Sequence, residues 1–185
     1  MEGRVKTRRV LLLGMPAALA AGIVLGSIAD LGAAPEATGA ADGPLAGYTT
    51  HLVATHFLRG REYRTHHYFK PLREGVLQGL VFREAADGAA MIEVEWAIAP
   101  AVYEALPEWQ KAYWHPLFPA VDAGRVELPD LPDAEEREML GTVRTLYAQT
   151  LNLAGLEGEL PVGLEGVAMV THLTAAEMRR LMAGR

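Results

Sequence analysis

The sequence of 185 residues contains no cysteine, which excludes disulfide bonds, thiolate metal ligands and cysteine nucleophiles. It also lacks a Gly-x-Ser-x-Gly motif, a Walker loop, a Gly-rich dinucleotide fingerprint and a His-Glu-x-x-His motif. Any catalysis must therefore depend on histidine, carboxylate, tyrosine or hydroxyl side chains. With 50% hydrophobic and 22% charged residues, the composition is typical of a globular domain with a core of its own.

Basic residues are scarce after the first 29 positions. The whole chain has 17 Lys and Arg against 23 Asp and Glu. Residues 1–29 contain four of the basic residues and one of the acidic ones, so residues 30–185 retain 13 and 22, a net charge of −9. An acidic domain repels phosphate backbones, so we expect no nucleic acid among its partners.

The first 29 residues have the pattern of a secretory signal. Basic residues are followed by an uncharged, apolar stretch over residues 10–28. The pair Arg8-Arg9 directly before this stretch is typical of twin-arginine export signals. The alternative is a retained membrane anchor, because 19 apolar residues (10–28) can just span a bilayer. We therefore expect an exported protein, periplasmic or extracellular, that contacts the membrane only through residues 10–28 if they are not cleaved.

Residues 30–44 are rich in Ala, Gly and Pro and predict a flexible linker. Residues 45–185 are then expected to form a single domain. Four strands are predicted at residues 48–58, 63–70, 76–83 and 91–98, and a last one at residues 167–171. Residues 154–166 predict a Gly-rich loop.

The predicted helices follow the fourth strand. Pro100 and Pro107 each favour the start of a short helix, the second reaching Trp114. An irregular segment covers residues 116–132, and a long helix is predicted from residue 134 to about 151 with Asp133 as its N-cap. Thr174 with Glu177 predicts a capping box for a terminal helix. The expected fold class is α+β, an antiparallel meander with helices packed on one side.

Residues 91–98 alternate strictly between apolar and acidic or small side chains. Ile92, Val94, Trp96 and Ile98 share one face of the predicted strand, and Glu93 and Glu95 share the other. The apolar row is expected to face the core. Glu95 is then expected to face solvent, a cleft or a covering loop.

Several short motifs occur in an order and spacing that resemble the oil body-associated protein family, a domain of unknown function found in plants, fungi and bacteria. The resemblance covers about residues 45–171. It rests on these runs: His66-His67-Tyr68, Val94-Glu95-Trp96, Leu106-Pro107-Glu108, Trp114-His115 and Leu160-Pro161-Val162-Gly163. The resemblance implies a domain of uncharacterised molecular function, which in plants is associated with lipid bodies.

The chain departs from this family at several polar positions. Phe69 and Gly79 stand where the family has cysteines, and Leu117 replaces a second histidine near His115. Pro119 and Ala120 replace a Tyr and a Glu.

A set of polar and aromatic residues is the candidate ligand site: His66, His67, Tyr68, Glu95, Trp114 and His115. Two or three histidines with one carboxylate suit zinc or a redox metal, which makes His66, His67, Glu95 and His115 candidate metal ligands. Neighbouring residues on a strand point to opposite faces, so only one of His66 and His67 can enter such a site. The alternative is a structural hydrogen-bonded network.

Three other histidines, His51, His56 and His172, are expected to be structural or exposed rather than ligands. The leading hypothesis is an exported binding or structural domain of uncharacterised function. One alternative is a metal-dependent enzyme with Tyr68 as acid or base. Another is a protein that associates with a lipid or membrane surface, or that binds a small ligand or lipid.

Overall fold

The structure is a computed structural model that describes residues 43–153 and 168–184. An antiparallel meander forms its centre. The four strands of this meander are β1 (Thr50–Leu58), β2 (Arg61–Arg73), β3 (Val76–Phe82) and β4 (Met91–Ile98). Four further strands extend the sheet: β5 (His115–Pro116), β6 (Val126–Glu127), β7 (Tyr147–Asn152) and β8 (Ala168–Val170). The strand order is β5-β7-β4-β3-β2-β1-β6, with β8 paired to β7. The predicted α+β class and the four-stranded meander are confirmed.

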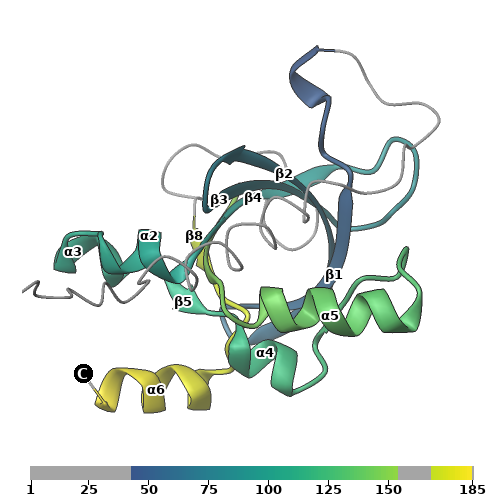
Figure 1. Cartoon of the computed structure of the whole chain (residues 1–185). Helices are drawn as coiled ribbons and strands as arrows, with labels where there is room; N and C mark the ends of the chain where they lie inside the picture. Colours follow the sequence, from purple (N-terminus) through teal and green to yellow (C-terminus); the bar gives the residue numbers. More distant parts are fainter. Residues whose placement is uncertain (1–42, 154–167, 185) are drawn as a thin grey trace, which may run out of the picture.

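The sheet curls until its two sides meet around an interior (Figure 1). β8 pairs with β7 on one side. Phe57 of β1 forms an antiparallel bridge with Thr171, directly after β8, on the other side. Consequently β1, at one end of the meander, lies beside the last strand of the chain. A curled sheet of this kind presents alternate residues of every strand to a shared interior.

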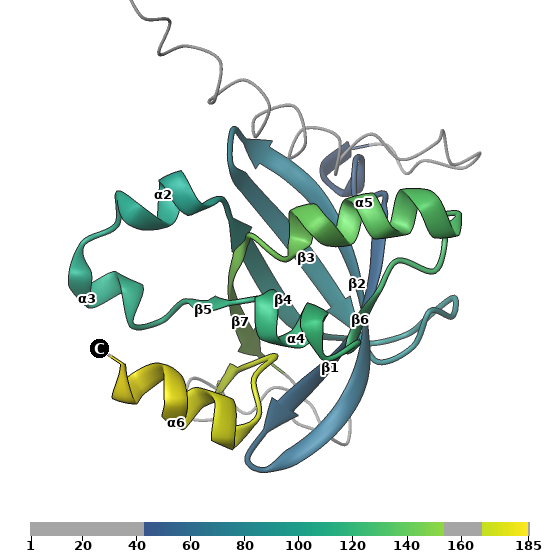
Figure 2. The same cartoon turned by 60° about the horizontal axis from the view of Figure 1, so that its bottom comes forward.

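In Figure 1 the α-helices lie below and beside the curled sheet, and β2 and β3 form the opposite side of the molecule. Figure 2, turned by 60°, shows α4 and α5 in front of the strands. A 3-10 helix, η1 (Gly43–Leu45), precedes β1. The α-helices are α2 (Pro100–Glu104), α3 (Glu108–Lys111), α4 (Phe118–Asp122), α5 (Asp133–Val143) and α6 (Ala175–Ala183). The capping box of Thr174 and Glu177 at the start of α6 is confirmed. Within the described ranges, no helix has the length and apolar character needed to cross a membrane.

The alternation of β4 is confirmed, but the direction assigned to its faces is wrong. Glu95 and Ala97 point into the interior and are 1% and 2% exposed, whereas Val94 and Trp96 are only half-buried on the outside. An irregularity in the β3–β4 pairing leaves Ile92 without a partner, so that both Ile92 and Glu93 are buried. On this inner face Glu93 meets His56 of β1, and Glu95 meets His67 of β2, so the carboxylates are paired where they are buried.

The long helix predicted to reach residue 151 is also wrong, because it ends at Val143 and residues 147–152 form β7. β7 pairs with β4 along one edge and with β5 and β8 along the other. Its inward residues Ala148, Thr150 and Asn152 alternate with less buried ones. Contacts between strands distant in sequence therefore override the local helical pattern. Asp133 is the first residue of α5 rather than its N-cap, which is Pro132.

Irregular structure was expected over residues 116–132, but this segment includes β6 and α4. The helix predicted to reach Trp114 ends at Lys111. The Gly-rich loop predicted at residues 154–166, the signal at residues 1–29 and nearly all of the linker lie outside the described residues.

Gly79 allows an aromatic ring to lie inside the curled sheet. Gly79 is paired between Phe69 on β2 and Glu95 on β4. A Cβ atom built on Gly79 would lie 2.6 Å from Cε1 of Phe69, well inside van der Waals contact. The missing side chain therefore makes room for the Phe69 ring beside the buried carboxylate.

We expect Gly79→Ala to lower the free energy of unfolding by about 1–3 kcal/mol, because it overpacks a rigid interior. The matched control is Gly141→Ala in α5, where nothing lies within 4 Å of an added Cβ. That change is expected to raise stability by up to about 1 kcal/mol, since alanine favours helix. Urea denaturation of both variants measures the difference. Equal effects at the two positions would contradict the close contact of Gly79 with Phe69.

Candidate metal centre

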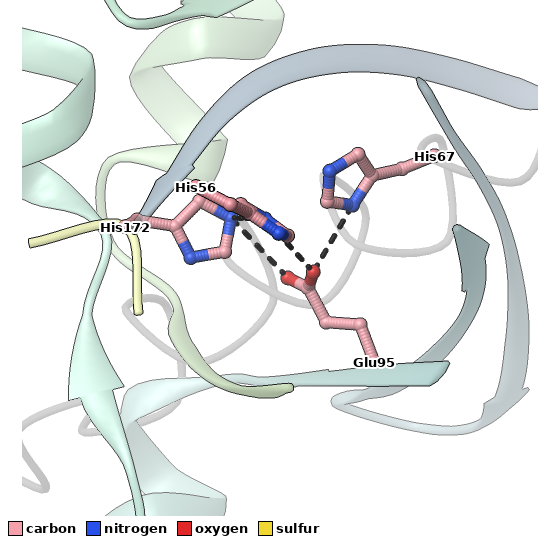
Figure 3. Close-up of side chains that lie close together, drawn as sticks. All are labelled: His56, His67, Glu95 and His172. Atoms are coloured by element: carbon pink, nitrogen blue, oxygen red, sulfur yellow. Dashed lines mark hydrogen bonds and ion pairs between the residues drawn. The ribbon is translucent and has the colours of Figure 1, made fainter. Parts of the chain in front are cut away.

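Four buried side chains converge inside the curled sheet (Figure 3). They are His56 on β1, His67 on β2, Glu95 on β4 and His172, two residues after β8. None is more than 1% exposed. Each offers one nitrogen or oxygen atom, and these four atoms lie within 4.8 Å of one another. Two donors bound to one ion at about 2.1 Å can be up to about 4.2 Å apart, so only small side-chain adjustments separate this set from a coordination shell.

The Glu95 carboxylate lies between the three imidazoles. Its Oε2 atom is 3.0 Å from His67 Nδ1 and 3.9 Å from His56 Nε2. Its Oε1 atom is 3.8 Å from His172 Nε2. The same two nitrogens, His56 Nε2 and His172 Nε2, are 2.9 Å apart.

The hydrogen bonds of Thr65 favour one tautomer of His67. The Thr65 hydroxyl donates its one proton to the carbonyl oxygen of Ala54 at 3.1 Å. It must then accept from His67 Nε2, which lies 2.8 Å away. In that arrangement Nε2 has the ring proton, and the Nδ1 atom of a neutral His67 lies 3.0 Å from Glu95 Oε2. Neither His67 Nδ1 nor Glu95 Oε2 has a hydrogen-bond partner among the described residues.

His56 is held in the matching orientation by Glu93. Its Nδ1 atom lies 2.6 Å from Glu93 Oε2 and donates a hydrogen bond to that carboxylate. Tyr63 Oη and Asn152 Nδ2 donate to Oε1 of the same carboxylate. Burial alone would raise the pKa of Glu93, but His56 and these donors lower it to about 2. A carboxylate behind a histidine is the usual support for a metal ligand, and it leaves His56 Nε2 free to face the interior.

His172 is oriented by His115. The backbone N–H of His172 donates to His115 Nε2 at 3.3 Å, which identifies that nitrogen as an acceptor. His172 Nδ1 lies 2.9 Å from the same atom and donates to it. The Nε2 atom of His172 is therefore the one without a proton. Arg125 Nη2 fixes the segment further by donating to the carbonyl oxygen of His172 and to Glu177.

The three outer nitrogens thus direct their protons away from the centre, and three inner lone pairs surround a carboxylate. Burial lowers the pKa of His67 and lowers that of His172 well below its ordinary value. Burial also lowers the pKa of His115 to about 4. Neutral imidazole is the form that binds metal ions. Lone pairs held this close repel one another unless a cation or shared protons lie between them.

Three imidazole nitrogens and one carboxylate oxygen suit a divalent first-row metal such as zinc, iron or manganese. Four protein donors fill a tetrahedral shell. They leave positions open for a metal that prefers five or six ligands. Glu93, Thr65 and His115 each form a hydrogen bond with the outer nitrogen of a different one of the three converging histidines.

Comparison with known proteins gives this chain a family. The model described as "Protein of unknown function (DUF1264)" matches residues 42–183. The chain belongs to the DUF1264 family. It is 34% identical to oil body-associated protein 1A of Zea mays over 72% of this chain and 59% of that protein. It is 29% identical to oil body-associated protein 1B of Arabidopsis thaliana over 64% of this chain and 52% of that protein.

The chain therefore spans little more than half the length of these relatives. No solved structure matches it. The resemblance drawn from the short motifs is confirmed by the family match.

Of the predicted site residues in this DUF1264 member, the structure brings His67 and Glu95 together with two other histidines. His66 and Tyr68 point to the opposite face of β2, where both lie against His51. His51 in turn lies 3.1 Å from Asp130. The rule that neighbours on a strand face opposite sides thus separates His67 from His66 and Tyr68.

His115 and Trp114 occupy supporting places. His115 lies on β5, paired with Ala148. It therefore does not directly follow a helix, as the predicted helix reaching Trp114 implied. It is buried and contacts His172, but it is not one of the four converging donors. Trp114 is half-buried and packs against an apolar cluster of Val76, Ile98 and Tyr103.

The sequence interpretation gave His56 and His172 no ligand role, yet both belong to the cluster. A signal for His56 was present: the turn at Arg59-Gly60 sets the β1–β2 register, which pairs His67 with Leu52. His56 is four residues from Leu52 and therefore shares its face. For His172 no such local signal exists, because its position depends on the bridge between Phe57 and Thr171.

Glu93→Gln is expected to lower the free energy of unfolding by about 1–3 kcal/mol at pH 7, because an amide cannot accept from all three donors. The depressed pKa of Glu93 stabilises the fold above its ordinary pKa of 4.5, and this contribution disappears as the pH falls toward about 2. The variant should therefore lose less stability than the wild type over that interval. Chemical denaturation of metal-free protein at pH 7 and pH 3 measures both effects.

The control is Glu127→Gln, which removes an exposed ion pair with Arg64. Exposed pairs contribute about 0–1 kcal/mol, so this variant should resemble the wild type at both pH values. A Glu93→Gln variant as stable as this control would contradict the buried role assigned to Glu93.

Proposed function

We propose that this DUF1264 protein is a metal-binding protein whose ion is held by His56, His67, His172 and Glu95. One observation carries the proposal: one donor atom from each of these four buried side chains lies within 4.8 Å of the other three. A divalent cation would use all four donors at once. The competing explanation is a structural network in which protons occupy the same gaps.

The burial of the donors favours tight binding. The ion would be surrounded by side chains that already have outer partners, so little ordering is needed when it binds. A metal in such a site acts as a Lewis acid or redox centre when a further ligand reaches it. Which reaction follows depends on that further ligand.

We expect the full-length chain to retain close to one equivalent of a divalent metal through purification. His67→Ala and Glu95→Ala should each weaken metal affinity at least tenfold, because each removes a direct donor. Elemental analysis and titration of chelator-treated protein with Zn²⁺, Fe²⁺ or Mn²⁺ measure this. Binding should also raise the wild-type Tm. At a free metal concentration of 100 times the Kd, it should add about 2.7 kcal/mol to the free energy of unfolding.

His66→Ala is the matched control, since His66 adjoins His67 but faces outward with His51. It should bind metal as the wild type does. If the wild type retains no metal and its Tm does not respond to any of the three ions, the cluster is a structural network. The proposed function is then wrong.

We also propose that residues 1–29 direct the protein out of the cytoplasm or anchor it in the cytoplasmic membrane. The support comes from the sequence alone: Arg8-Arg9 precedes the uncharged stretch of residues 10–28. A protein that passes the membrane folded can carry a buried metal with it, so this route is compatible with the proposed site.

Replacing both Arg8 and Arg9 by Lys keeps the charge but removes the paired guanidinium groups. In a bacterial host with a twin-arginine pathway, we expect this variant to stay in the cytoplasm while the wild type reaches the periplasmic or membrane fraction. Arg4→Lys is the control and should behave as the wild type. Identical fractionation of all three would contradict twin-arginine export.

A further inference from the structure

A buried cavity opens directly beside the proposed metal centre. It is lined by Glu95 and His172, two of the four converging donors. The rest of its wall is almost entirely apolar and comes from β1 to β4, β6 and the segments around α4 and α5. Its main apolar lining residues are Leu52, Phe69, Leu77, Leu117, Val143 and Leu146, all of them buried.

One hydroxyl in this apolar wall lacks a partner. Thr50 lines the cavity, is 7% exposed, and its Oγ1 atom forms no hydrogen bond among the described residues. Glu95 Oε2 is likewise without a hydrogen bond. A buried hydroxyl without a partner costs about 1–3 kcal/mol and is commonly explained by a bound molecule. The cavity therefore has a polar end at the centre and a lone polar group elsewhere in its wall.

The cavity is small. About 20 Å³ is open to the centre of a water-sized molecule, which is enough for roughly one or two such molecules. A molecule with a ring or a long chain would have to displace buried side chains from a well-packed interior. The size therefore selects a ligand of two or three heavy atoms.

We infer that this cavity receives a small exogenous ligand of the metal, of the dioxygen or azide size class, bound at a coordination position that the protein leaves open. The inference rests on the proposed metal site and adds the class of molecule that reaches it. The charge of the metal would offset the hydration that an anion such as azide loses on entering, and the apolar wall would surround the rest of the ligand. Among the cavity-lining residues, Thr50 has the one hydroxyl group, and it could donate a hydrogen bond to the ligand atom that does not bind the metal.

The test uses the full-length protein loaded with Co²⁺, whose visible absorption reports its coordination. We expect azide, with three heavy atoms, to change the absorption bands in a saturable way. Imidazole binds metal ions well in solution, but its ring exceeds the cavity. It should therefore bind at least tenfold more weakly than azide.

Two variants test the position of the ligand. Ala97 lines the cavity two residues from Glu95 on the same face of β4, so Ala97→Val fills space without removing a metal donor. It should weaken azide binding at least tenfold and leave Co²⁺ binding unchanged. Val94→Ile, on the outer face of the same strand, is the control and should leave both unchanged.

The metal site and the cavity ligand are tested by different results. If Co²⁺ does not bind the wild type, the proposed metal site is wrong. If Co²⁺ binds but azide leaves the bands unchanged, or imidazole binds as tightly as azide, the inference about the cavity is wrong while the metal site stands. The comparison of azide with imidazole needs only the wild type, so it decides the question even if Ala97→Val fails to fold.

Discussion

The repulsion between buried lone pairs is the constraint on which the interior of this protein depends. Nitrogen atoms of three imidazoles and an oxygen of Glu95 lie within 4.8 Å of one another, with none of these residues more than 1% exposed. In a medium of low polarizability, unpaired acceptors cost several kcal/mol unless something positive lies between them. The arrangement is fixed from outside by Glu93, Thr65 and His115, each of which accepts a hydrogen bond from the outer nitrogen of one imidazole.

The curled sheet makes this convergence possible because it brings distant parts of the sequence to one interior. His56 and His67 come from adjacent strands of a hairpin, Glu95 comes two strands later, and His172 comes from the other end of the folded part. The bridge between Phe57 and Thr171 closes the sheet, and Arg125 holds the segment after it by binding the His172 carbonyl and Glu177. Loss of closure would remove His172 from the cluster and expose the other three side chains.

The interior has a polar part and an apolar part. On β2 and on β4, the lining changes from polar to apolar between one inward-facing residue and the next. On β4, Glu93 and Glu95 lie in the polar part and Ala97 begins the apolar part. On β2, His67 is polar and Phe69 apolar, and the absence of a side chain at Gly79 lets the Phe69 ring reach toward the centre. A metal at the boundary would be bound by the polar part and would face a cavity formed by the apolar part.

The sequence by itself determined the α+β class, the four strands of the meander, the capping box at Thr174 and the family. These features depend on short-range patterns: alternation, turn residues and motif order. It also placed His66 and His67 on opposite faces, since neighbours on a strand must diverge, but not which of the two points inward. Only the tertiary structure decided that Glu95 points inward, that residues 147–152 form a strand, and that His56 and His172 join His67. Each of these depends on how the sheet curls and closes, and contacts between residues far apart in the sequence leave no local periodicity from which they could be read.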